Sequence, residues 1–187
     1  MKCGILYYDG FSEFEVAIAL QNLAPKAEIV GVGLEKRPYA SEEKQVFLPT
    51  LAVSEARADD FDVFLIPGGN SSPLLTSRDL RTFLTALKER GKIIAAICGG
   101  VLLLGSFGLL QGKRFTGEAR EFEYSAEDLV RYFQGATYTG EDVVIDGNIV
   151  TAMGQAFIEF GIEVADLAGI FPDHRAKQRE LGWYKNI

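Results

Sequence analysis

The chain has 187 residues, of which 48% are hydrophobic and 24% charged, and this balance excludes a disordered or low-complexity protein. The length fits one ordinary domain, so we expect a single domain over residues 1–187. A net charge of -7 argues against a nucleic-acid binder, which needs a basic surface, and against binding to anionic membranes.

Cysteine and histidine are scarce. The two cysteines, Cys3 and Cys98, are too few for a disulfide scaffold, and the single histidine is His174. Because no Cys/His cluster has zinc spacing, we expect no metal and no cofactor. No stretch has the pattern of a signal peptide or a membrane span, so we expect a cytoplasmic protein.

Short apolar runs alternate along the chain with helix-like segments. The predicted strands cover residues 3–8, 28–33, 61–66, 92–97, 114–116, 143–145 and 149–151, the last two as a hairpin. The predicted helices cover residues 12–23, 79–90, 101–107, 127–133, 155–171 and 175–184, while residues 36–51 form a loop or hairpin. This alternation predicts an α/β protein with a mostly parallel sheet and helices on both faces.

Cys98 is the most informative residue. It stands between a buried strand and a helix and is followed by Gly99 and Gly100, which is the pattern of a nucleophile elbow. The amides and dipole of the following helix would stabilise a thiolate and lower the cysteine pKa. The alternative is a buried structural cysteine with no chemical role.

A second glycine pair follows another buried strand, at Gly68 and Gly69. Because the carboxyl ends of parallel strands share one edge of the sheet, this turn should lie beside Cys98. We expect the Gly69 and Gly99 amides to form an oxyanion hole above the sulfur. An ordinary strand-end turn is the alternative. Residues 153–155, which follow the last strand, are expected to line the same pocket.

Glu15 supplies the third element of the expected site. A carboxyl group beside a thiolate gains a higher pKa through burial and like charge, and in its protonated form it donates a hydrogen bond to the sulfur. The spacing from Ser12 to Glu15 is equally typical of a capping box, which needs no catalytic role.

Three segments together resemble the ThiJ/PfpI superfamily: residues 9–15 (DGFSEFE), 66–70 (IPGGN) and 96–100 (AICGG). Residues 105–116 and 143–152 are similar to it as well. The superfamily includes a Parkinson-disease protein deglycase, bacterial stress proteins, isocyanide hydratases and intracellular peptidases. The resemblance implies a flavodoxin-like three-layer sandwich, as in class I glutamine amidotransferases, and a homodimer. It also implies the Cys98 nucleophile, its partner Glu15, and oxyanion-hole amides at Gly69 and Gly99.

The chain departs from this pattern at residues 116–119, where many members carry a Thr-x-His-Pro-like segment. Glu118 stands in the place of the histidine, either as an acid/base group or as a solvated loop carboxylate near Arg120. His174 is expected at a helix end or on the surface. The missing Cys-His pair disfavours peptidase and glutamine amidotransferase activity, which need an imidazole for the leaving amine.

These patterns favour a cysteine-dependent hydrolase- or lyase-like enzyme that acts on small electrophiles. A glyoxalase- or deglycase-like reaction on α-oxoaldehydes or their adducts, as part of a stress response, is the first hypothesis. An isocyanide-hydratase-like hydration at Cys98 is the second. The third is a non-catalytic redox sensor or ligand-binding domain. The expected partner is a small-molecule substrate, with no nucleic acid and no membrane.

Overall fold

The computed structural model describes residues 1–117 and 126–186 of the chain. Its centre is a seven-stranded sheet with the strand order β10-β11-β7-β6-β1-β2-β5. The strands are β1 (Lys2–Tyr7), β2 (Glu28–Gly33), β5 (Leu51–Ala52), β6 (Val63–Ile66), β7 (Ile93–Ile97), β10 (Val143–Asp146) and β11 (Ile149–Ala152). Neighbouring strands are parallel except in the hairpin β10–β11, which confirms the predicted mostly parallel sheet.

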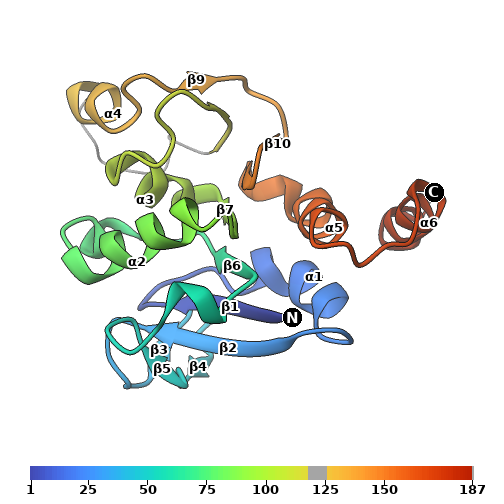
Figure 1. Cartoon of the computed structure of the whole chain (residues 1–187), viewed down its shortest axis with the longest axis horizontal. Helices are drawn as coiled ribbons and strands as arrows, with labels where there is room; N and C mark the ends of the chain where they lie inside the picture. The colour runs from blue at the N-terminus through green and yellow to red at the C-terminus, as the bar shows by residue number, and fades with distance from the viewer. Residues whose placement is uncertain (118–125, 187) are drawn as a thin grey trace.

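Helices cover both faces of this sheet. They are α1 (Phe14–Leu23), α2 (Arg78–Glu89), α3 (Val101–Ser106), α4 (Ala126–Tyr132), α5 (Phe157–Leu167) and α6 (His174–Lys185). Figure 1 shows α2 and α3 on one side of the sheet and α1, α5 and α6 on the other. The three-layer α/β prediction is therefore confirmed. The predicted helix over residues 155–171 is shorter at both ends in the structure. Residues 154–156 form a 3-10 turn before α5, and α5 ends at Leu167.

Two small sheets flank the central one. The segment predicted as a loop or hairpin contains β3 (Tyr39–Ala40) and β4 (Val46–Phe47), which pair antiparallel. The strand predicted at residues 114–116 is β8 (Arg114–Phe115). It pairs in parallel with β9 (Thr137–Tyr138) rather than with the central sheet.

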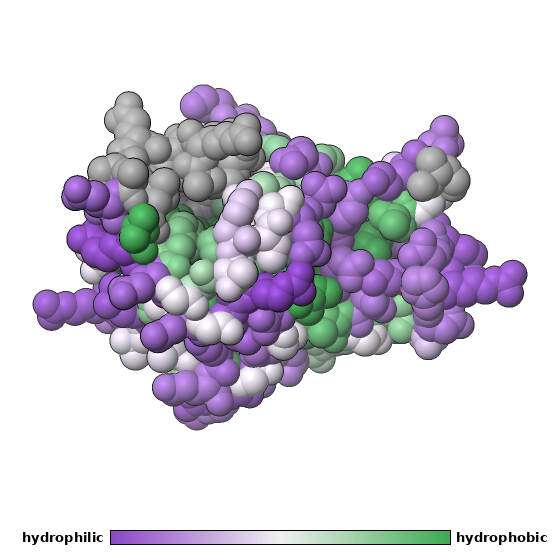
Figure 2. Space-filling view, turned by 90° about the horizontal axis from the view of Figure 1, so that it is seen from above, coloured by the Kyte–Doolittle hydropathy of each residue, from purple (hydrophilic) through white to green (hydrophobic). Residues whose placement is uncertain are grey.

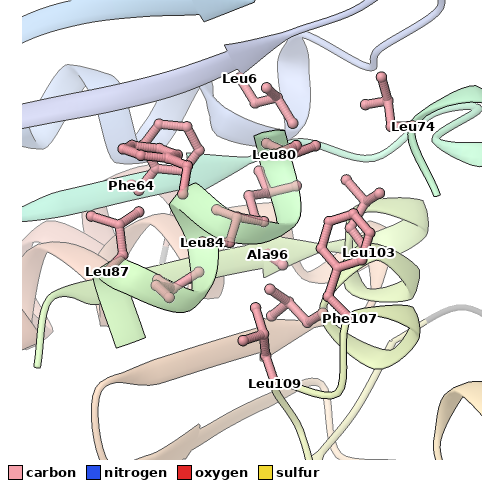
Figure 3. Close-up of a cluster of buried hydrophobic side chains, with 14 of the residues drawn as sticks. Leu6, Phe64, Leu74, Leu80, Leu84, Leu87, Ala96, Leu103, Phe107 and Leu109 are labelled. Carbon is pink, nitrogen blue, oxygen red and sulfur yellow. The ribbon is translucent and has the colours of Figure 1, made fainter. Parts of the chain in front are cut away.

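The sequences of β6 and β7 explain why the sheet is buried on both faces. All four residues of β6 are buried, as are the last four of β7, so apolar side chains point alternately into the two helical layers. Figure 3 shows one of these layers, in which leucines of α2 and α3 pack around Phe64 and Ala96. The opposite layer joins α1 and α5 to Leu65 and Ile97. The core thereby fixes the carboxyl ends of β6 and β7 against each other.

The predicted capping box at the start of α1 is wrong. The helix begins at Phe14, and its N-cap residue, Glu13, makes no side-chain capping hydrogen bond. The hydroxyl of Ser12 donates instead to Glu42 Oε2 at 2.6 Å, and its amide donates to the Gly68 carbonyl. Glu15 points into the interior and is 3% exposed. Its side chain is therefore available to the site at the edge of the sheet.

The exposed surface is largely polar. Figure 2 shows hydrophilic residues over most of one face, with hydrophobic residues gathered between them. Within residues 1–117 and 126–186, no helix combines the length and the apolar character that a membrane crossing requires.

Candidate active site

Cys98 stands at a sharp corner between β7 and α3, in the 3-10 turn Cys98–Gly100. Its backbone φ is +52°, in the left-handed region that non-glycine residues seldom adopt. A Cβ on Gly100 would lie 2.5 Å from the Pro67 carbonyl oxygen, so glycine is needed for the close approach of this corner to β6. The side chain of Cys98 is 6% exposed. The predicted elbow is therefore present, and its strained backbone is typical of a functional position.

Glu15 meets Cys98 beside Gly68. The Gly68 amide donates a 2.7 Å hydrogen bond to Glu15 Oε2. A Cβ built on Gly68 would lie 2.4 Å from that oxygen, 2.6 Å from the Cys98 Cβ and 3.1 Å from the Cys98 sulfur. The carboxyl group and the thiol therefore occupy the space that a side chain at position 68 would fill.

Gly154 closes the site from the opposite side. It begins the 3-10 turn that leads into α5, directly after β11. A Cβ at this position would lie 3.1 Å from Glu15 Oε1 and 3.2 Å from the Cys98 sulfur. Of residues 153–155, which are expected at the site, Gly154 therefore lies beside Glu15 and the Cys98 sulfur. The site draws on the carboxyl ends of β6, β7 and β11 and on the first turn of α1.

Tyr8 and Ser71 complete the inner site, and the sequence patterns do not single out either of them. The Tyr8 hydroxyl oxygen lies 2.6 Å from the Gly68 carbonyl oxygen and 2.9 Å from that of Pro67, and donates to this pair. Ser71, which is 0% exposed, donates from its hydroxyl to the Gly99 carbonyl at 2.8 Å. Their hydrogen bonds reach residues that are distant along the chain, so local spacing carries no signal for them.

The surroundings of Tyr8 act on the pKa of its hydroxyl. Burial raises the pKa of Tyr8 well above its usual value, and the negative charges of Glu15, Cys98 and Glu42 raise it further. The tyrosine therefore keeps its proton and remains a hydrogen-bond donor across the neutral pH range.

The other predicted residues have distinct positions. Gly69 has φ +98° and forms a bridge with Phe11, and Gly99 lies in the elbow turn. Glu118 lies outside the described residues. His174 is the first residue of α6 and is exposed, as expected. Within the described ranges, no three His, Cys, Asp or Glu side chains are grouped so that they could hold a metal ion.

The fold and the site define an α/β protein with a cysteine at a nucleophile elbow and a buried carboxyl group beside it. The chain belongs to the DJ-1/PfpI family, whose model matches residues 1–167. The sequence resemblance to this superfamily is thereby confirmed.

Several family relatives are similar over most of their length. YraA of Bacillus subtilis, named as a candidate cysteine protease, is 40% identical over 155 residues, which cover 81% of this chain and 88% of YraA. The isonitrile hydratase of Pseudomonas putida is 34% identical over 175 residues, covering 91% and 73%. Deglycase TK1284 of Thermococcus kodakarensis is 28% identical over 154 residues, covering 81% and 89%.

Solved structures share the same architecture. The DJ-1 superfamily protein Atu0886 from Agrobacterium tumefaciens aligns with a TM-score of 0.83 at 25% identity. The alignment covers 98% of this chain and 97% of that protein. The flavodoxin-like fold of the superfamily is therefore the fold of this chain.

Proposed function

We propose that this protein is a cysteine-dependent enzyme that acts on small electrophiles, with α-oxoaldehydes or their adducts as substrates. One observation carries the proposal: the Cys98 sulfur and both oxygens of Glu15 converge in the space left free by Gly68 and Gly154. The deglycase relative supports the substrate class. Strain at Cys98 holds the sulfur in this space, where a carbonyl carbon can be attacked.

The first chemical step is addition. The Cys98 sulfur, as the thiolate, forms a bond to the aldehyde carbon, and the π electron pair of the carbonyl moves to oxygen. The amides of Gly69 and Gly99 are proposed to stabilise this developing alkoxide. A proton from the Glu15 carboxyl then converts the alkoxide to a hydroxyl and leaves a neutral hemithioacetal.

Glu15 is suited to carry this proton. Its Oε2 is held by the Gly68 amide. Its Oε1 and the Cys98 sulfur lie 3.1 Å and 3.2 Å from a Cβ built at Gly154, so both border the same small space. A carboxyl group and a thiol that are both removed from water favour a state in which they share one negative charge. Glu15 is therefore proposed as the acid/base group, and Glu118 as a further candidate on the segment outside the described residues.

A hydration of isocyanides at the same cysteine is the second candidate. The isonitrile hydratase relative favours it. The Cys98 sulfur would add to the terminal isocyanide carbon, and a proton from the Glu15 carboxyl would go to the same carbon to give a thioimidate. Water would then add to this carbon, and departure of the Cys98 thiol would release an N-substituted formamide. A third role, as a redox sensor, uses Cys98 without turnover. Peptidase activity is less favoured, because the single histidine is His174, which lies exposed at the start of α6.

Further proposals concern the cellular context. We propose that residues 1–187 form a single domain and that the protein assembles as a homodimer. We also propose a cytoplasmic location and a role in stress response. Sedimentation equilibrium would test the homodimer directly, and a monomer at micromolar concentration would contradict it.

Turnover assays on methylglyoxal and on an alkyl isocyanide test the enzymatic proposals. We expect activity on methylglyoxal that Cys98→Ser abolishes and Cys3→Ser retains. Cys3 is the matched control, because it is fully buried on β1. Turnover of the isocyanide alone would favour the second candidate. No turnover on either substrate, combined with stoichiometric peroxide oxidation of Cys98, would favour the sensor.

A further inference from the structure

Two separate chain segments supply the amides of the proposed oxyanion hole. Gly69 lies on the turn after β6, and Gly99 lies on the elbow after β7. Consecutive glycines have wide conformational freedom, so nothing intrinsic to Gly68 and Gly69 fixes the peptide unit between them. Its orientation must come from contacts made by other residues.

The carbonyl of the Gly68–Gly69 peptide is held by two donors. The Tyr8 hydroxyl lies 2.6 Å from it, and the Ser12 amide donates to it at 2.9 Å. In a trans peptide the N–H points opposite to the C=O, so these bonds also set the direction of the Gly69 N–H. The antiparallel bridge between Phe11 and Gly69 gives the same orientation. Its two hydrogen bonds run from the Ser12 amide to the Gly68 carbonyl and from the Asn70 amide to the Gly10 carbonyl. In such a pair the Gly69 amide faces away from Phe11.

Ser71 connects the two segments. It lies on the same turn as Gly69, and its hydroxyl donates to the Gly99 carbonyl at 2.8 Å. Ser71 is 0% exposed and Gly99 is buried, so a lost hydrogen bond here is costly. The Gly99 carbonyl also accepts from the Val101 amide within the elbow, so Ser71 is its donor from the other turn. This bond therefore fixes the distance between the turn after β6 and the elbow.

We propose that Tyr8 and Ser71 are positioning residues that orient the Gly69 amide and hold it in register with the Gly99 amide. The inference rests on the proposed function, because it concerns the same oxyanion. Tyr8 acts on the peptide plane, and Ser71 acts on the spacing of the two turns. The hydrogen bonds of these two hydroxyls go to backbone carbonyls of the two turns, so we place their action on the backbone.

Turnover of methylglyoxal by Tyr8→Phe and Ser71→Ala tests this proposal. Tyr7→Phe and Ser72→Ala are the matched controls, since each removes a hydroxyl from the adjacent position. Loss of one oxyanion-hole donor typically lowers kcat by about 100- to 1000-fold, and we expect misorientation to lower it by about 10- to 100-fold. KM should change little, because the amides act on the transition state. The controls should keep kcat within about 2-fold.

Alkylation by iodoacetamide separates positioning from general damage. This displacement forms no oxyanion, so it reports on the sulfur and not on the amides. We expect both variants to keep the wild-type alkylation rate and its pH dependence. A parallel loss of alkylation and turnover would show structural damage at Cys98 and would overturn the positioning role.

Residual dipolar couplings of the Gly69 and Gly99 amides give a readout that needs no substrate. We expect Tyr8→Phe to change the Gly69 coupling. We expect Ser71→Ala to change the couplings of Gly99 and of Gly100, whose N–H lies in the same peptide as the Gly99 carbonyl, while couplings in β1 and β7 stay constant. Unchanged couplings at these glycines would overturn the inference. Absence of wild-type turnover would overturn the proposed function alone, because the couplings still decide whether Tyr8 and Ser71 orient these amides.

Discussion

The Gly68 amide donates a 2.7 Å hydrogen bond to Glu15 Oε2, and this bond joins the turn after β6 to the first helix. It orients a buried carboxyl group towards Cys98 and gives that carboxyl a fixed position without a cap at the start of α1. The relationship supports the proposed role of Glu15 at the site, because its carboxyl group is held by Gly68 and does not cap α1.

Glu15→Gln should retain the fold and lose most of the turnover. The amide side chain has the size of the carboxyl, and its oxygen can still accept the Gly68 hydrogen bond, but it cannot exchange a proton. General acid/base groups contribute about 10²- to 10⁴-fold, so we expect kcat to fall within that range. Glu15→Asp should also lose activity, because its shorter side chain withdraws the carboxyl from the sulfur. Full activity in Glu15→Gln would contradict the proton-transfer role, provided that thermal unfolding of the variants matches the wild type.

Gly68→Ala and Gly154→Ala should damage the site in a definite order. A Cβ at position 68 would lie 2.6 Å from the Cys98 Cβ, so the elbow itself must shift. A Cβ at position 154 meets the nearest atoms at 3.1–3.3 Å, which requires only small adjustments. Since a displacement of about 1 Å can cost about 10²-fold in rate, we expect at least that loss for Gly68→Ala and a smaller loss for Gly154→Ala. Equal kcat values in the two variants would contradict this steric account.

The layout of the site is largely predictable from sequence, because its turns follow the carboxyl ends of strands in one parallel sheet. Buried runs that end in Pro-Gly-Gly and Cys-Gly-Gly identify β6 and β7, and the carboxyl ends of parallel strands share an edge. The approach of Glu15 to Cys98 follows from the same rule. The hydrogen bond between Glu15 and the Gly68 amide does not follow from this rule. By spacing alone, Ser12 and Glu15 match a capping box. Only the tertiary structure shows that Glu15 is held by Gly68.

The remaining site residues depend on contacts that spacing does not encode. Tyr8 and Ser71 are ordinary in sequence, and their hydrogen bonds reach turns that are distant along the chain. Gly154 is required for the space that it leaves rather than for a special backbone angle. Sequence patterns report backbone preferences well, but they do not report which atoms fill the volume beside a glycine.

Asp146 provides a pH-dependent contribution to stability away from the site. Hydrogen bonds from the Arg114 amide and the Lys113 ammonium, each 2.9 Å long, hold the pKa of Asp146 below its usual value. A lowered pKa in the folded state means that this stabilisation is present above the ordinary carboxyl range and is lost as the pH falls through the folded pKa. Asp146→Asn should therefore lower the Tm at pH 7, and the difference from wild type should shrink towards pH 2. Asp142→Asn, at a nearby exposed position, is the control for the removal of one surface carboxylate.

The two cysteines should differ sharply in reactivity in the folded protein. Burial raises the pKa of Cys3 to about 12, so at neutral pH it remains a thiol, and it is 0% exposed. Cys98 stands at the elbow, is 6% exposed, and has its sulfur beside Gly68 and Gly154. Because the thiolate is the reactive form, we expect iodoacetamide to add one equivalent, located on Cys98 by peptide mass spectrometry.

Denaturant supplies the control for this labelling. Unfolding removes the burial of Cys3, so both cysteines should then react, and native Cys98→Ser should take up no label. Labelling of Cys3 in the native protein at a rate comparable to Cys98 would contradict the burial argument. It would also mean that Cys3→Ser is not an inert control in the turnover assay. Selective reaction at Cys98 would show that the thiol reactivity of the native protein comes from the elbow, because Cys3 stays an unreactive thiol within β1.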